Sequence, residues 1–135
     1  MRHWGMKSSI VYDELDPRLQ DVMDYVLQNV ADVSLLCGHR NQHDQNELFY
    51  AEPQRTKVRW PDSKHNKQPA LAVDFRPWPL PARTEKLWAS LAYVAGAAKQ
   101  YALSKGVTLR WGGDWDGDGD LTDQNFDDLF HLEVK

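Results

Sequence analysis

Three well-separated segments of the chain carry side chains that suit a catalytic metal site. The residues are His65 in Ser-Lys-His, Asp74 in Ala-Val-Asp, and His131 in Asp-Leu-Phe-His. Zinc accepts two imidazoles and one carboxylate at catalytic sites, where three protein ligands leave a fourth position for water. The alternative interpretation is that each residue is an ordinary solvated side chain. A structural zinc site fits less well, because such sites favour cysteine and the chain has one cysteine.

Two of these residues fall on segments in which apolar and polar side chains alternate, a pattern that predicts β-strands. Asp74 and His131 lie on the faces opposite the apolar residues, so both can point to the same side of a sheet. His65 belongs to a polar, proline-containing stretch over residues 52–69, which we predict to be a long loop. This loop leads directly into the Asp74 strand and can fold back over it.

Periodicity and turn residues predict the remaining elements. Asp16-Pro17 opens a helix, because aspartate caps helix N-termini and proline is favoured at the first helical position. The predicted helices span residues 17–30, 41–51 and 83–104, and the predicted strands span 33–37, 70–75, 107–111 and 130–134. We therefore predict an α+β fold with about three helices and a short, largely antiparallel sheet. It forms one small domain over residues 1–135, in which residues 1–10 are candidates for disorder.

Composition excludes several classes of protein. With 135 residues the chain has the length of one domain, and its net charge of −4 argues against binding nucleic acid through bulk charge. No apolar run approaches about 18 residues, so we expect no membrane insertion. Cys37, the single cysteine, excludes an internal disulfide framework. We expect Trp88 in the core, and either a substrate groove or packing under loops for Trp60, Trp78, Trp111 and Trp115.

Taken together, the metal-binding segments resemble the VanY-type zinc peptidases. This family includes D-alanyl-D-alanine carboxypeptidases and the L-alanyl-D-glutamate endopeptidases that phages use as endolysins. The resemblance covers about residues 37–134 and includes Trp-Gly-Gly-Asp-Trp at 111–115. One departure is the spacing between His65 and Asp74, where many members have a shorter interval containing glycine and this chain has Pro69. We interpret the longer interval as a loop variant.

The resemblance implies that His65, Asp74 and His131 bind zinc and that Asp128 is the catalytic carboxylate. Chemistry agrees, because zinc lowers the pKa of bound water to about 7 and a nearby carboxylate can accept its proton. Glu133 follows His131 by two residues on the same strand face. It is a rival for the base, or a partner that orients a ligand imidazole.

Two further residues gain candidate roles from the resemblance. Arg40, in Gly-His-Arg after the first predicted strand, would stabilise a developing oxyanion or hold a substrate carboxylate. Its alternative role is a surface salt bridge. Ser63 would hydrogen-bond substrate or shape the loop that carries His65.

A loop rich in aspartate and glycine precedes the last predicted strand. The sequence over residues 114–120 matches the first half of an EF-hand loop, in which alternate carboxylates converge on a hard cation. The candidate calcium ligands are Asp114, Asp116, Asp118 and Asp120. Asn125 stands where an EF-hand has its glutamate, and Asp123 or Asp127 could replace it. Some peptidases that this chain resembles depend on calcium; the alternative is an exposed acidic turn.

We therefore predict a zinc-dependent peptidoglycan peptidase that cleaves stem peptides, best matched by an L-alanyl-D-glutamate endopeptidase acting as a phage or prophage endolysin. Within this class the alternative is a D-alanyl-D-alanine carboxypeptidase. From another class, the alternative is a non-catalytic calcium-binding wall-adhesion or virion module. The N-terminal residues lack the apolar core of a secretory signal. We accordingly expect a monomer in the host cytoplasm that reaches the wall through a phage-made membrane lesion.

Overall fold

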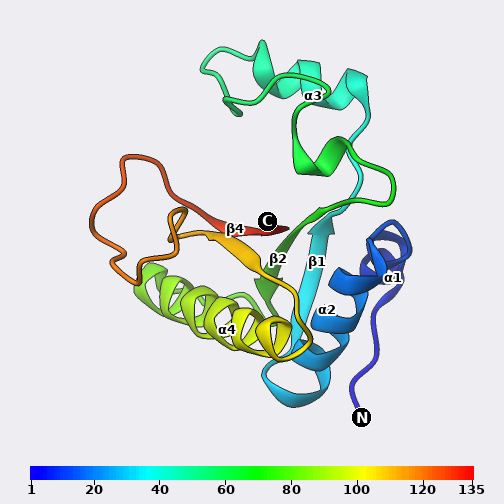
Figure 1. Cartoon of the computed structure of the whole chain (residues 1–135), viewed down its shortest axis with the longest axis vertical. Coiled ribbons are helices and arrows are strands. Elements are labelled where there is room, and N and C mark those ends of the chain that lie inside the picture. Colours follow the sequence, from blue (N-terminus) through cyan, green and yellow to red (C-terminus); the bar gives the residue numbers. More distant parts are fainter.

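A four-stranded antiparallel sheet forms the centre of the computed structural model, which describes all 135 residues. Its strands are β1 (Val33–Cys37), β2 (Ala72–Pro77), β3 (Leu109–Gly112) and β4 (Asp128–Val134). They are arranged in the order β1-β2-β4-β3, and every neighbouring pair is antiparallel (Figure 1). The sheet confirms the predicted α+β class.

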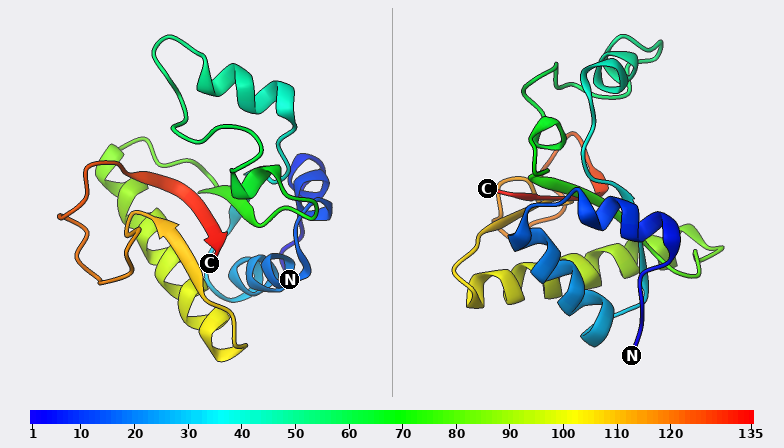
Figure 2. Two further views of the ribbon diagram at one scale, coloured as in Figure 1. Left: turned by 45° about the horizontal axis from the view of Figure 1, so that its top comes forward. Right: turned by 90° about the vertical axis from the view of Figure 1, so that its right-hand side faces the viewer.

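The helices occupy both sides of this sheet. They are α1 (Met6–Asp13), α2 (Pro17–Asn29), α3 (Gln42–Phe49), α4 (Thr84–Ser104) and the short 3-10 helix η1 (Lys64–Asn66). Helices α2 and α4 lie against one face, whereas α3 and η1 lie on the other (Figure 2). No helix has the length and apolar character needed to cross a membrane.

The apolar core fills the space between the sheet and the α2–α4 layer. Helix α2 begins as predicted, because the Asp16 side chain accepts a hydrogen bond from Arg18 N and proline occupies its first position. The core side chains include Leu19, Val22, Met23, Val26, Val73, Phe75, Leu91, Val94, Ala95 and Leu132. Because the apolar residues of β2 and β4 turn toward this layer, their polar residues are left for the opposite face.

Helix α1 is the one α-helix that the sequence did not predict; the single 3-10 turn η1, inside the predicted loop over residues 52–69, was not predicted either. It begins within residues 1–10, the segment considered for disorder, and no side chain caps its N-terminus. Tertiary contact holds it in place, since the backbone N–H of Leu35 in β1 donates a hydrogen bond to Ser8 Oγ at 3.0 Å. Such a contact leaves no periodic signal in the local sequence.

The expectation that Trp88 lies in the core is wrong. Its side chain is 56% exposed, because the buried residues of α4 begin only at Leu91.

The tryptophans near the motifs differ in how far they are buried. Trp111 is buried in the core, Trp78 is exposed, and Trp115 lines the cleft described below.

Candidate active site

His65, Asp74 and His131 meet at one point on the polar side of the sheet. Asp74 and His131 face each other across β2 and β4, and η1 supplies His65. His65 Nε2 lies 3.2 Å from Asp74 Oδ1 and 3.2 Å from His131 Nδ1, and His131 Nδ1 lies 3.3 Å from Asp74 Oδ1. The three potential ligand atoms therefore form a nearly equilateral triangle.

Each imidazole is oriented by a hydrogen bond from its outer nitrogen. His65 Nδ1 donates to the carbonyl oxygen of Gly38 at 2.7 Å, since a carbonyl can only accept. His131 Nε2 donates to Glu133 Oε1 at 2.8 Å. In the neutral rings these bonds leave both inner nitrogens as lone-pair donors beside Asp74. With both rings neutral, three electron-rich atoms converge, an arrangement that a bound cation stabilises.

The size of the triangle fits zinc. Tetrahedral zinc with ligands at about 2.0–2.1 Å has ligand atoms separated by roughly 3.3–3.4 Å. The observed separations are 3.2, 3.2 and 3.3 Å. The donor set, two imidazoles and one carboxylate with outer hydrogen bonds in place, is also typical of a catalytic zinc site.

The electrostatics of the triangle favour positive charge. Burial lowers the pKa of His65, but hydrogen bonds with Asp74 and Cys37 outweigh burial and raise that pKa to about 10. Burial likewise acts to raise the pKa of Asp74, yet hydrogen bonds with the two imidazoles hold it well below its usual value. The cluster therefore accommodates cationic charge, whether as protons on the imidazoles or as a metal ion.

Asp128 and Glu133 occupy different positions around the triangle. Asp128 is half-buried at the start of β4 and lines the cleft. Burial raises its pKa, and the charge of Asp74 raises it further, which suits a carboxylate that transfers protons. Glu133 lies behind the His131 ring, and the hydrogen bond from His131 keeps its pKa low despite burial. This placement favours Glu133 as the partner that orients His131.

A close backbone contact sets the position of Asp128. Gly112 in β3 is its partner in the β3–β4 register, where the ladder is irregular. A Cβ atom built on Gly112 would lie 2.0 Å from the carbonyl oxygen of Asp128. Only glycine permits this approach, so β3 helps to determine where the Asp128 side chain enters the cleft.

Arg40 is held inside the site by a buried glutamine. Its Nη1 donates to Gln45 Oε1 at 3.1 Å, and its Nη2 lies 3.9 Å from Asp74 Oδ2. Gln45 is fully buried, and its Nε2 donates to Val58 O at 2.6 Å. Arg40 is therefore not in a surface salt bridge. Sequence reasoning missed Gln45, because a glutamine in a short polar helix gives no sign of burial.

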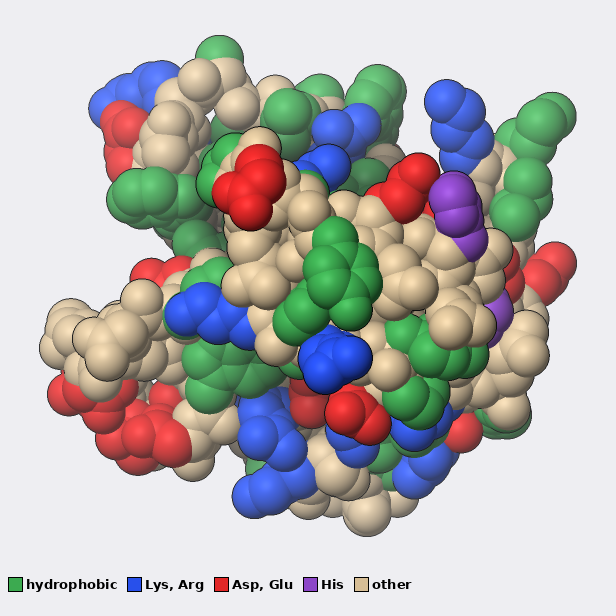
Figure 3. Space-filling view, turned by 90° about the horizontal axis from the view of Figure 1, so that it is seen from above, with side chains coloured by type: hydrophobic (Ala, Val, Ile, Leu, Met, Phe, Trp, Pro, Cys, Tyr) green, Lys and Arg blue, Asp and Glu red, His purple; other side chains and the backbone are tan.

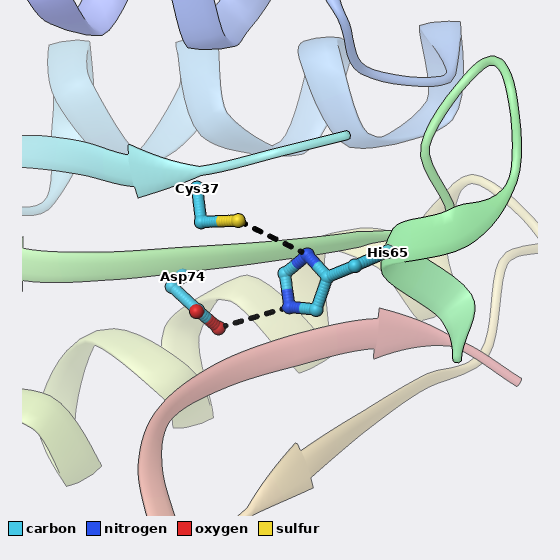
Figure 4. Close-up of side chains that lie close together, drawn as sticks. All are labelled: Cys37, His65 and Asp74. Atoms are coloured by element: carbon cyan, nitrogen blue, oxygen red, sulfur yellow. Dashed lines mark hydrogen bonds and ion pairs between the residues drawn. The ribbon is translucent and has the colours of Figure 1, made fainter. Parts of the chain in front are cut away.

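Ser63 and Cys37 both contact His65. Ser63 Oγ accepts a hydrogen bond from His65 N at 3.1 Å and caps η1, so the hydroxyl shapes the turn that carries the imidazole. Cys37 Sγ lies 3.8 Å from His65 Nδ1, on the opposite side of the ring from Asp74 (Figure 4). Because that nitrogen is already bonded to Gly38 O, Cys37 is less suited than His131 to share an ion with Asp74. The sequence assigned no site role to Cys37.

The triangle opens into a cleft of about 410 Å³. One wall is the arm, defined here as residues 50–63 between α3 and η1, and the other is the acidic loop, residues 113–127 between β3 and β4. Trp115 and Phe126 line the cleft from the acidic loop. The Trp115 ring lies 5.6 Å from that of His131, measured between centroids, so the acidic loop packs beside the cluster of His65, Asp74 and His131.

Some of the predicted calcium ligands in the acidic loop lie close together. Oxygens of Asp114, Asp116 and Asp118 lie within 4.8 Å of one another, whereas Asp120 Oδ1 accepts hydrogen bonds from Thr122. Asp114 is 4% exposed, and its buried Oδ1 has no hydrogen-bond partner. Beside this group, a hydrogen bond with Asp118 raises the pKa of Asp123 to about 6. The loop projects from the body (Figure 1), and carboxylates gather at the lower left of Figure 3.

Comparisons with known proteins concern the family and the fold of the chain. The protein-family model described as phage L-alanyl-D-glutamate peptidase matches residues 2–134. Among solved structures, the L-Ala D-Glu endopeptidase ChiX of Serratia marcescens is similar, with a TM-score of 0.71, 22% identity, and coverage of 96% of this chain and 87% of that chain. At this identity the likeness shows a shared fold alone. No curated protein sequence matches the chain significantly.

Proposed function

Because the chain belongs to the phage L-alanyl-D-glutamate peptidase family, we propose that it uses zinc to cleave the bond between L-alanine and D-glutamate in peptidoglycan stem peptides. The observation that best supports this role is the triangle of His65, Asp74 and His131 at the base of an open cleft. As an endolysin, it would reach the wall from the host cytoplasm through a lesion in the membrane.

The residues around the triangle supply the other parts of peptide hydrolysis. Zinc bound there would polarise the scissile carbonyl and lower the pKa of the attacking water. The Asp128 carboxylate accepts the proton of that water and returns it to the departing amine of D-glutamate. Arg40, fixed by Gln45, provides positive charge for the developing oxyanion. Glu133 holds the His131 ring in its productive orientation.

Two observations favour this function over its alternatives. The family match specifies an L-alanyl-D-glutamate peptidase rather than a D-alanyl-D-alanine carboxypeptidase. A non-catalytic calcium-binding module would have no use for Asp128, a half-buried carboxylate beside the triangle. Burial of such a group costs free energy, which a catalytic role justifies.

Digestion of purified peptidoglycan, followed by mass spectrometry of the fragments, tests the proposal. The expected products are stem peptides that begin with glutamate and glycan strands that retain alanine alone. Release of terminal D-alanine would indicate the carboxypeptidase instead. His131→Ala should abolish cleavage while Glu85→Gln, a surface change in an exposed ion pair with Arg83, should not.

We also propose that the acidic loop binds calcium. The support is Asp114 Oδ1, a buried carboxylate oxygen without a partner, beside oxygens of Asp116 and Asp118. Oxygen ligands suit calcium rather than zinc. Gly117 and Gly119 adopt φ values of 72° and 85°, which lets the chain turn tightly between the carboxylates. Ordering of this loop would also fix the wall of the cleft next to His131.

A further inference from the structure

The cleft has an uneven distribution of charge. Asp74 belongs to the triangle, and the carboxylates of Asp128 and Glu133 flank it. Arg55 and Lys57 line the opposite part from the arm, which also contributes Asp62. No carboxylate lies within ion-pairing distance of either cation. The chain as a whole has a net charge of −4. Cations that line this cleft without an ion-pair partner, Arg55 and Lys57 on the arm and Lys64 on η1, therefore indicate an anionic ligand.

The backbone that carries these cations is anchored at both ends. Arg55 N donates to Leu48 O at 3.0 Å, and Val58 O accepts from the buried Gln45 at 2.6 Å. Lys57 Nζ lies 5.1 Å from the centre of the Phe126 ring, across the cleft on the acidic loop. The side chains of Arg55 and Lys57 are exposed, whereas the backbone that carries them is fixed. Because this segment is already ordered, less conformational entropy is lost when a ligand binds.

Arg40 is less available for the same task. Its guanidinium is already bonded to Gln45 Oε1 and lies 3.9 Å from Asp74 Oδ2. This places it at the catalytic end of the cleft, where it can serve the reacting carbonyl. A substrate carboxylate at that end would also meet the negative charge of Asp128 and Glu133. The arm offers the more favourable position for such a group.

The substrate class supplies a matching anion. A glutamyl residue has two carboxyl groups, one of which joins the following residue while the other stays free and ionised. We propose that Arg55 and Lys57 form a subsite that binds this free carboxylate and so selects glutamate after the scissile bond. The inference rests on the proposed function and deepens it, because it assigns the residues that recognise the substrate.

The test compares two synthetic peptides that contain the L-alanyl-D-glutamyl bond. One has the free glutamyl carboxylate and the other has a carboxamide in its place. Charge-assisted hydrogen bonds to one or two cations predict that the wild type prefers the acid by about 10- to 100-fold in kcat/KM. The double variant Arg55→Gln/Lys57→Gln should lose that preference through a higher KM for the acid, with kcat and cleavage of the amide nearly unchanged.

Arg59→Gln is the matched control. Arg59 lies on the same arm but packs over the Phe49 ring and does not line the cleft, so its loss should leave the preference intact. Equal cleavage of both peptides by the wild type, or an unchanged preference in the double variant, would overturn the inference while leaving the proposed function standing. Failure of the wild type to cleave either peptide would instead contradict the proposed function itself.

Discussion

Replacement of Glu133 by glutamine separates the two roles that its position allows. The variant keeps the size of the side chain but removes the charge that accepts the hydrogen bond from His131 at 2.8 Å. Both side chains are largely buried, with exposed fractions of 12% and 9%. A hydrogen bond to a charged group in such surroundings contributes about 1.5–3 kcal/mol. If Glu133 orients a ligand, Glu133→Gln should weaken zinc binding by about 10- to 100-fold.

Two measurements on the same variant distinguish the roles. Competition with a chromophoric chelator gives the zinc affinity, and the rate of peptidoglycan cleavage is followed as free zinc is raised. We expect the rate of Glu133→Gln to recover largely at saturating zinc. Asp128→Asn should show the converse, with wild-type zinc affinity and a rate reduced by about 10²–10⁴-fold, the usual contribution of a general base.

The opposite result would exchange the assignments. If Glu133→Gln binds zinc like the wild type yet loses about 10²–10⁴-fold in rate at every zinc concentration, Glu133 is the base. Retention of activity by Asp128→Asn would support that conclusion independently. Glu85→Gln, an exposed carboxylate paired with Arg83, serves as the control for nonspecific effects of removing one negative charge.

Three further predictions concern other parts of the structure. Gly112→Ala places a Cβ 2.0 Å from the carbonyl oxygen of Asp128 in β4. This clash should displace Asp128 and lower activity by about 10- to 100-fold. Gly96→Ala, which meets nothing within 4 Å, should stay active; equal activity of the two variants would contradict the positioning role of β3. Millimolar calcium should raise the free energy of unfolding by about 0.4–2.7 kcal/mol if the dissociation constant is 10⁻⁵–10⁻³ M. Asp114→Asn should abolish that gain, and no gain in the wild type would leave the loop an ordinary acidic turn. Gln45→Leu should lower stability in urea by about 1–3 kcal/mol, because buried partners lose their hydrogen bonds; an unchanged midpoint would refute this.

The sequence predicted the elements whose side chains alternate or recur with regular spacing. Strand β1 was predicted with its observed bounds, Val33–Cys37, and α2 and α4 within one residue at each end. Alternation also placed Asp74 and His131 on the polar face of the sheet, where they are direct partners. These features depend on local patterns, which is why one sequence was sufficient.

Features that depend on tertiary contacts escaped prediction. Helix α1 is held by a bond between Ser8 and β1, and Gln45 is buried because three segments converge on its amide. Nor could spacing alone choose between the roles of Glu133, since both required only a position on the strand face of His131. The orientation of the His131 ring, with Nε2 toward Glu133, is what favours the orienting role.

X-ray diffraction at the zinc absorption edge, from crystals of the zinc-loaded protein, tests the central claim most directly. The claim is that His65, Asp74 and His131 together hold one catalytic ion. The expected result is a single strong anomalous peak bonded to His65 Nε2, Asp74 Oδ1 and His131 Nδ1, within about 2.0–2.2 Å of each atom. A peak beside Cys37 or within the acidic loop, with none at the triangle, would contradict the account.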